Sequence, residues 1–423
     1  MRFANPAQNL RPRVLFLNRS YWPDMEATGQ LLTELCEGLA ARFNVEVISG
    51  QPNSITPEAP ENWRTQDSRN SVRISRLRHT QFAKGRLWAR AVNYLTFSAA
   101  VRNSLRRWPA PDAVVFETDP FLLAFEAHRL RRRTGCRLIG YLQDIHPDVG
   151  IALGKIRNSY AIRRLRESLF RVYRDCDRVV VLSQDMRKLL CAGGVAPERV
   201  VVIPNWADTE RIAPSSGVNG FRRKHGLEER FLVMYSGNLG LTQRLSDFVS
   251  TAALLADDPR IHFAFVGRGA LEAELRADVS ARQLKNVSFF DYQPRELLGE
   301  SLSAADLHLV PLTASLAGCL MPSKLYGILA AGRPCLTNAP ADTELHRLVC
   351  EEGVGFAVPS GSVSELAHAI RTAASDPGRI QEMNIRARRL AETRFSRELS
   401  IGKFGSLLDT VLQCSGEPVL QTV

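Results

Sequence analysis

The sequence has no two cysteines close enough in the chain to form a metal-binding or redox motif. Its eight cysteines stand at least fifteen residues apart, so neither a CxxC pair nor zinc-ligand spacing occurs. Most of them lie in apolar runs, where free cysteine behaves as a small hydrophobic residue. The pattern is typical of a reducing compartment, and we expect a cytoplasmic protein.

Long hydrophobic runs are also missing. The uncharged stretch 91–101 has eleven residues, and the stretch 307–323 has seventeen but contains Pro311, Gly318 and Pro322. A transmembrane helix needs about 20 apolar residues, so none is predicted. Residues 1–13 are polar and carry three arginines, which does not fit a secretory signal.

Acidic residues are scarce in the first half of the chain. The net charge is +11, and residues 1–205 hold 32 Lys and Arg against 19 Asp and Glu, whereas residues 206–423 hold 23 against 25. The first half is therefore expected to meet something anionic. The stretch 86–107, with Trp88, Leu95 and several arginines, is a candidate interfacial helix at an anionic membrane surface, and a core helix with a basic outer face is the alternative.

A length of 423 residues favours two domains, and the residue pattern is the same in both. Short β-branched runs alternate with longer amphipathic stretches. The expected strands are 14–18, 45–49, 72–77, 113–117, 138–142, 179–183 and 200–204, then 232–236, 262–266, 287–290, 307–311, 334–336 and 356–358. Such alternation predicts α/β domains with parallel, doubly wound, Rossmann-like sheets.

Composition sets the predicted boundaries. Residues 1–208 form the first domain, 209–228 a small and polar linker, and 229–394 the second domain. Residues 395–423 are predicted to form a helix that packs back toward the first domain. Ligands bind open α/β sheets at the carboxyl ends of the strands, so we expect the site in the cleft between the domains.

Two glycine turns follow predicted strands of the second domain. The run YSGNLG at 235–240 precedes a helix opened by Gln243 and Arg244, and the run FVGRG at 265–269 contains Gly267 and Arg268. Glycines at such turns let the backbone approach a phosphate near a helix N-terminus. A tight turn without a ligand is the alternative.

A third motif is the run MPSKLY at 321–326. Ser323 is a candidate N-cap, and Lys324 stands in the first turn of the predicted helix. A cation there opposes the helix dipole and favours an anionic ligand, with a solvated lysine as the alternative.

In the first domain, the run QDIHPD at 143–148 follows a predicted strand. Asp144, His146 and Asp148 are candidate acid/base residues. A loop in which the two aspartates cap helices is the alternative. Nucleic acid is not an expected partner, because the basic runs have no interleaved aromatic residues.

Together these motifs resemble glycosyltransferase family 4, of the GT-B fold, and in particular bacterial enzymes of colanic-acid, O-antigen and exopolysaccharide biosynthesis. The runs that carry the resemblance cover nearly the whole chain and are YWP at 21–23, TG at 28–29, DIHPDVGIALG at 144–154, VLS at 181–183, IPNWAD at 203–208, SGNLG at 236–240, FVG at 265–267, YQPRELL at 292–298, PSKLYG at 322–327 and AGRP at 331–334. The ordered set is specific for the family and not for a sugar.

The resemblance implies two Rossmann-like domains facing across a cleft, with a nucleotide-sugar donor on the second. The implied donor contacts are Gly237, Asn238 and Gln243 in the phosphate-binding turn, Tyr292 and Gln293 near the base, Ser323, Lys324 and Leu325 at the diphosphate and ribose, and Gly29 in a glycine loop of the first domain. It also implies retaining transfer to a lipid-linked saccharide acceptor at the inner face of the cell membrane, without cofactor or metal. Protein cations and helix dipoles then stabilise the leaving diphosphate.

Asp175 and Asp177 spell the DxD motif of metal-dependent transferases. They stand between a predicted helix and a predicted strand, so we interpret them as a turn, and no metal site is predicted. The three arginines at 131–133 are interpreted as a solvated helix end.

The sequence departs from the family pattern at several donor positions. Many members carry arginine where Asn238 stands and lysine where Gln243 stands, and Arg244 and Lys324 are the nearby cations expected to replace them. Two glutamates normally precede the AGRP run, whereas no acidic residue lies between Asp306 and Asp342. These losses leave two alternatives, a non-catalytic nucleotide-sugar-binding or scaffold protein of a polysaccharide assembly complex and a nucleotide-sugar epimerase.

Overall fold

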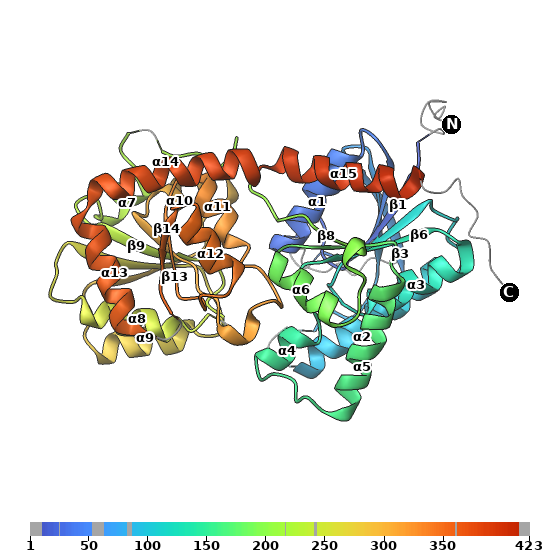
Figure 1. Ribbon diagram of the computed structural model, residues 1–423, viewed down its shortest axis with the longest axis horizontal. Helices are drawn as coiled ribbons and strands as arrows, with labels where there is room; N and C mark the ends of the chain where they lie inside the picture. The colour runs from blue at the N-terminus through green and yellow to red at the C-terminus, as the bar shows by residue number, and fades with distance from the viewer. Residues whose placement is uncertain are drawn as a thin grey trace. The chain divides into compact units, whose positions relative to one another are not determined.

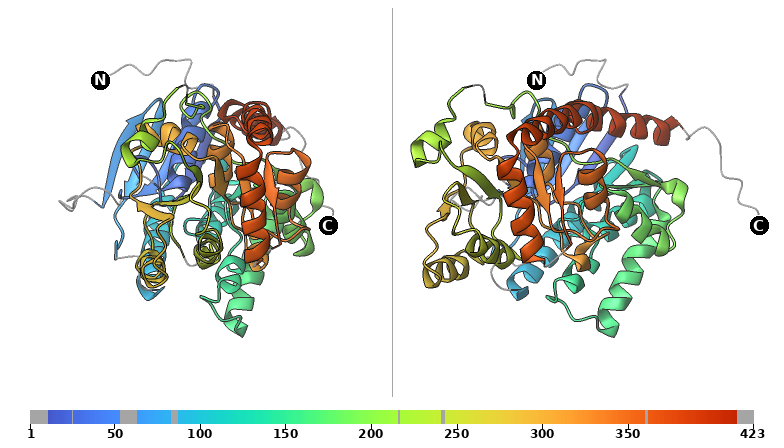
Figure 2. Two further views of the ribbon diagram at one scale, coloured as in Figure 1. Left: turned by 90° about the vertical axis from the view of Figure 1, so that its left-hand side faces the viewer. Right: turned by 60° about the vertical axis from the view of Figure 1, so that its left-hand side comes forward.

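A computed structural model describes residues 11–24, 26–52, 63–82, 87–215, 217–240, 243–359 and 362–413. The chain divides into two compact units, one of Met1–Pro204 with Ser400–Val423 and the other of Asn205–Leu399. In each unit a sheet lies between helices on its two faces (Figures 1 and 2). This confirms the predicted α/β class with two Rossmann-like sheets. No helix in the described ranges is long and apolar enough to cross a bilayer.

The first unit has an eight-stranded sheet in the order β3-β4-β2-β1-β5-β6-β7-β8. Its strands are β1 (Arg13–Leu17), β2 (Asn44–Gly50), β3 (Arg64–Arg69), β4 (Val72–Leu77), β5 (Ala113–Phe116), β6 (Arg137–Leu142), β7 (Arg178–Val181) and β8 (Val200–Val202). Neighbouring strands are parallel except for β3 with β4. The strand order reverses between β1 and β5, and such a switch point is where open sheets bind ligands.

Strand β3 has no counterpart among the predicted strands. Its sequence RTQDSR contains no apolar residue, and it forms the antiparallel edge of the sheet with mostly exposed or half-buried side chains. An edge strand that buries neither face carries no hydrophobic alternation for a sequence pattern to detect.

Helices cover both faces of the first sheet. They are α1 (Ala27–Leu39), α2 (Leu87–Leu105), α3 (Leu123–Thr134), α4 (Asp148–Ala152), α5 (Tyr160–Asp175), α6 (Gln184–Ala192) and the part of α15 (Arg397–Gln413) from Ser400 onward. Phe16 and Val115 are register partners, so Phe116 points to the opposite face. Phe404 of α15 contacts Phe16, whereas Tyr173 of α5 stacks on Phe116, so α15 and α5 lie on opposite faces.

The second unit has a six-stranded parallel sheet in the order β11-β10-β9-β12-β13-β14. Its strands are β9 (Phe231–Ser236), β10 (Ile261–Val266), β11 (Val287–Phe290), β12 (Leu307–Leu309), β13 (Cys335–Thr337) and β14 (Gly355–Ala357). This is the 3-2-1-4-5-6 order of the dinucleotide-binding folds, with its switch point between β9 and β12.

The two faces of this sheet hold separate cores. The helices are α7 (Gly220–His225), α8 (Leu245–Leu254), α9 (Glu272–Ala281), α10 (Leu298–Ser303), α11 (Lys324–Ala330), α12 (Glu344–Glu351), α13 (Val363–Ser375) and α14 (Pro377–Arg394). Val233 and Tyr235 pack with α8 and α13, whereas Leu232 and Met234 pack with Phe221 of α7. Helix α7 lies inside the segment 209–228 that composition predicted to be a linker, because the buried Phe221 ties it to the sheet.

Candidate functional site

The glycine turns at the carboxyl ends of β9 and β10 are in direct backbone contact. The Gly237 N–H donates to the Val266 carbonyl (2.9 Å), and the Gly267 N–H donates to the Phe290 carbonyl (2.8 Å). Both glycines have left-handed backbone, with φ of +137° and +136°. A Cβ on Gly267 would lie 2.1 Å from the Gly237 carbonyl oxygen, so only glycine fits there.

Lys324 places a cation at this turn. Its Nζ lies 3.5 Å from the centroid of the Tyr235 ring, over the ring face, and a Cβ on Gly237 would lie 3.6 Å from it. The Nζ is buried and has no hydrogen-bond partner in the part of the chain that the structure describes. Burial lowers the pKa of Lys324 well below its ordinary value. The cation–π contact is attractive, but it leaves the ammonium without a counter-ion.

The neighbours of Lys324 in the sequence form the start of α11 and pack against the core. Ser323 occupies the N-cap position of α11, as predicted, although its side chain makes no capping bond. The Leu325 side chain is fully buried. Gly327 packs close to Leu302, with 3.3 Å between a hypothetical Cβ and the leucine Cδ1. A larger side chain at 327 would therefore have to displace core atoms.

Asn238 and Arg268 belong to the contacting turns. The Asn238 carbonyl accepts a hydrogen bond from the Tyr235 hydroxyl (2.8 Å), and its side-chain oxygen lies near Gly269. Arg268 is exposed and pairs with Asp291 (2.8 Å). Arg268 is therefore neutralised locally, whereas Lys324 is not.

Tyr292 and Gln293 follow β11, next to the same turns. The Tyr292 side chain is 55% exposed, and its ring lies beside Gly267. The Gln293 amide donates to the Asp291 carbonyl (2.9 Å). The exposed ring at a strand end is positioned to contact a flat ligand group.

Gln243 and Arg244 stand at the start of α8. Arg244 has a left-handed φ of 44° and pairs with Asp247 (3.1 Å). No contact among the described residues joins Arg244 to Lys324. Leu241 and Thr242, which precede them, lie outside the described residues. Of the two cations expected at the phosphate site, only Lys324 is left without a carboxylate.

In the first unit, Gly29 lies in the first turn of α1. A Cβ there would lie 2.5 Å from the Ser20 Oγ, so this residue allows α1 to approach the loop after β1. The Gly29 carbonyl accepts a hydrogen bond from the Thr33 hydroxyl (2.7 Å), and Thr33 accepts from the Trp22 N–H (3.1 Å). This places the glycine at the carboxyl end of the switch strand.

Asp144 and His146 share a buried environment with Asp119. Burial, with a smaller contribution from the Asp119 charge, raises the pKa of Asp144 to about 6. Burial lowers the pKa of His146 to about 4, and its ring stacks on Phe121 at 5.1 Å. At neutral pH His146 is therefore a neutral imidazole, and Asp144 can exchange a proton near neutrality.

Asp148 does not join them. Its carboxylate accepts two bonds from the Arg166 Nε (2.8 and 3.0 Å), and it is the first residue of α4. Both carboxylate oxygens are thus engaged by one arginine of the same unit. Asp148 therefore serves as an ion-pair partner at a helix start, and it does not make the capping bond of the alternative.

Three residues of this site were not predicted from the sequence: Arg19, Glu117 and Asp119. Arg19 follows β1 and forms an ion pair with Asp119, which follows β5 (2.8 Å). Glu117 is 1% exposed, and burial beside Asp119 raises its pKa well above the ordinary value. The available signal was the polar run ETD at 117–119 at the end of a hydrophobic strand, next to the switch point.

The DxD aspartates are used within the first unit. Asp177 pairs with Arg131 and Arg137 and accepts from the Leu138 N–H (2.8 Å), and Asp175 contacts His128. The interpretation of the arginine run at 131–133 as solvated is wrong for the half-buried Arg131, whereas Arg132 and Arg133 are exposed, and Arg133 also donates to two backbone carbonyls. No cluster of three or more His, Cys, Asp or Glu suited to a metal occurs in the described ranges.

Comparisons with known proteins agree with these two units. Residues 28–211 match the family described as Glycosyltransferase Family 4, and residues 219–390 match Glycosyl transferases group 1. The chain is 29% identical to WcaI of Escherichia coli (strain K12), a glycosyl transferase named for colanic acid biosynthesis, over 93% of this chain and 98% of that protein.

Solved structures share the fold. Sucrose-phosphate synthase from Thermosynechococcus elongatus has a TM-score of 0.74 at 18% identity and covers 96% of this chain and 100% of its own. HepE of Anabaena, in complex with UDP-glucose, has a TM-score of 0.71 at 17% identity and covers 94% and 99%. The matches favour a transferase over the non-catalytic and epimerase alternatives. The chain thus belongs to the glycosyltransferases of the GT-B fold, with a family 4 domain followed by a group 1 domain.

Proposed function

We propose that the chain transfers a sugar from a nucleoside-diphosphate sugar to a lipid-linked saccharide acceptor in the synthesis of a bacterial surface polysaccharide. The observation that carries this proposal is the buried Lys324 ammonium beside Gly237, which has no counter-ion among the described residues. The similarity to WcaI and the UDP-glucose bound by HepE support the choice of reaction and donor.

The donor diphosphate is assigned to the turns that end β9 and β10. Burial disfavours the charged form of Lys324, and a diphosphate bound beside it would stabilise that form. Gly237 lies next to the Lys324 Nζ, and the exposed Tyr292 ring lies next to Gly267. Lys324 then stabilises the negative charge that develops on the leaving diphosphate. In this proposal the protein itself supplies that stabilisation, without a cofactor or metal.

The proton-handling part of the reaction is assigned to Asp144, with His146 and Asp119 around it. A carboxylate with a pKa of about 6 holds enough negative charge at neutral pH to orient and polarise an acceptor hydroxyl. At the same strand ends, Arg19 pairs with Asp119, and the buried Glu117 lies close enough to Asp119 for that charge to raise its pKa. We also propose that the transferred sugar keeps its anomeric configuration, on the ground of the resemblance to family 4.

A lipid-linked acceptor requires the first unit to reach a membrane surface. Helix α2 turns Phe97 and Val101 into the core, but Trp88 and Leu95 are 56% and 60% exposed. These two residues are seven apart and so lie on one helix face, and Phe82 contacts Trp88 with 5.7 Å between ring centroids. The proposal therefore places this face of the helix at the headgroup level of an anionic bilayer.

The first prediction concerns Lys324. Lys324→Ala removes the cation of the proposed diphosphate site, so the affinity for UDP and GDP should fall at least about tenfold, since hydrogen bonds to charged groups contribute roughly 1.5–3 kcal/mol. Isothermal titration calorimetry measures the change. The control is Lys285→Ala, at an exposed lysine of the same unit. Equal nucleotide affinities in the two variants would remove Lys324 from the site.

The second prediction concerns Asp144. The carboxylate form exists above the raised pKa of about 6, so turnover should be lost as the pH falls through that value. Asp144→Asn should lower turnover roughly 100-fold or more, abolish this acid limb, and change the donor affinity less than about threefold. Asp175→Asn, at the aspartate that contacts His128, is the control and should keep both. A parallel loss of turnover and donor affinity in Asp144→Asn would indicate a structural role instead.

The third prediction concerns the membrane. Leu95→Glu should weaken binding to phosphatidylglycerol-containing vesicles about tenfold, because burying a leucine side chain contributes roughly 1.5–3 kcal/mol. Vesicle co-sedimentation measures the change. Ile385→Glu is a matched control, since Ile385 is 61% exposed but lies in the second unit. Binding that is insensitive to Leu95→Glu would exclude this helix face.

A further inference from the structure

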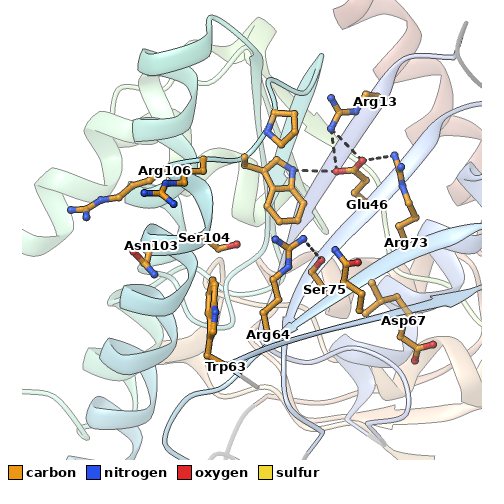
Figure 3. A pocket seen from close by; sticks show the side chains of 15 residues that line it. Arg13, Glu46, Trp63, Arg64, Asp67, Arg73, Ser75, Asn103, Ser104 and Arg106 are labelled. Atoms are coloured by element: carbon orange, nitrogen blue, oxygen red, sulfur yellow. Dashed lines mark hydrogen bonds and ion pairs between the residues drawn. The ribbon is translucent and has the colours of Figure 1, made fainter. Parts of the chain in front are cut away.

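The first unit contains a cavity of about 700 Å³ that the proposed reaction does not use. It lies between the end of α2 and the strands β3 and β4 (Figure 3). Its polar and aromatic lining residues include Glu46, Trp63, Arg64, Arg73, Ser104 and Trp108. Cavities of this size hold small organic molecules.

The cavity is at the opposite end of the sheet from the candidate active site. Arg13, the first residue of β1, lines it, whereas Arg19 and Asp119 stand beyond the carboxyl ends of β1 and β5. Strand β1 has five residues at about 3.3 Å each, so the sheet itself separates the two sites. A ligand in the cavity would be distinct from donor and acceptor.

The lining is positively charged. Arg13 and Arg73 both pair with Glu46, as Figure 3 shows. By contrast, Arg64, Arg106 and Arg107 line the cavity without a carboxylate partner in the described ranges. Arginine without a partner at a cavity favours phosphate or carboxylate ligands, because its planar donors match their oxygens.

Two buried polar atoms of the lining have no hydrogen-bond partner among the residues that the structure describes. They are the Nε of Arg64 and the Oγ of Ser104, and Ser104 is only 6% exposed. The other side of the Arg64 guanidinium donates to the Ser75 hydroxyl (3.0 Å) and stacks on Trp108 at 4.6 Å, so its position is fixed. Buried polar atoms are normally paired, and a ligand with hydroxyl or phosphate oxygens would pair both.

Trp63 adds an apolar surface to this polar lining. Its side chain is 52% exposed, and Figure 3 shows it between Asn103 of α2 and Arg64 of β3. An open indole face accepts the apolar face of a ring. A bare anion would need the arginines but not Trp63, and a neutral sugar would need Trp63 but not the arginines.

From these observations we infer that the cavity is a binding site for a sugar phosphate. The phosphate lies against Arg64, Arg106 and Arg107, the ring covers Trp63, and a hydroxyl pairs with Ser104. The inference goes beyond the proposed transfer reaction and does not depend on it, since no residue of the cavity takes part in that reaction.

The test is calorimetric titration of the full chain with glucose 1-phosphate in the presence of excess UDP, which occupies the proposed donor site. Trp63→Ala, and separately Arg106→Gln with Arg107→Gln, should each weaken binding about tenfold. The matched controls are Tyr160→Ala, at an exposed aromatic residue of the same unit, and Arg102→Gln, at an exposed arginine of α2, and both should bind as the natural chain does.

Three results would overturn the inference: no binding at millimolar glucose 1-phosphate, equal affinity in the lining and control variants, or equal affinity for inorganic phosphate alone or glucose alone. Thermal melts check that the variants fold. If UDP itself does not bind, the proposed donor site fails, but the difference between lining and control variants still decides the fate of the cavity.

Discussion

The buried amino group of Lys324, which has no carboxylate partner among the described residues, is the constraint around which the second unit is arranged. Helix α11 begins at this residue and places its Nζ over the Tyr235 ring at the end of β9. The ring supplies a weak attraction, but no carboxylate balances the charge among the described residues. A protein that retains such a charge gains from it only when a ligand brings the opposite sign. The adjoining glycine turns contact each other through backbone atoms and bring Gly237 next to the Lys324 Nζ.

The two units concentrate opposite charges at their strand ends. The first unit gathers Glu117, Asp119 and Asp144, with Arg19 as the counter-ion of Asp119. The second unit presents Lys324 and glycine backbone at its strand ends. No acidic residue lies between Asp306 and Asp342 in its sequence. The second unit is thus suited to hold a diphosphate, and the first to handle a proton. This division explains why the missing glutamates of the family pattern do not remove the features needed for the proposed reaction.

The sequence alone predicted both sheets, since hydrophobic strands alternating with amphipathic helices are local patterns. It did not predict β3, whose six polar residues carry no such pattern. It also did not predict α7, which is held against the sheet by a single buried residue, Phe221. The helix dipole favoured an anionic ligand at Lys324 over a solvated lysine, and the structure shows its Nζ buried. Local spacing could not show that Asp148 pairs with Arg166 or that Arg244 pairs with Asp247. Arg19 and Asp119 are brought together by the pairing of β1 with β5, which local patterns do not show. The cavity between α2, β3 and β4 is likewise lined by segments that are distant in sequence.

The central claim is that Lys324 binds the diphosphate of the donor at the glycine turn. A crystal structure of the chain with UDP tests it most directly. The account predicts a phosphate oxygen at about 3 Å from the Lys324 Nζ, with the diphosphate over Gly237 and the base near Tyr292. A nucleotide bound elsewhere, or bound here with the Lys324 ammonium still directed only at the Tyr235 ring, would contradict it.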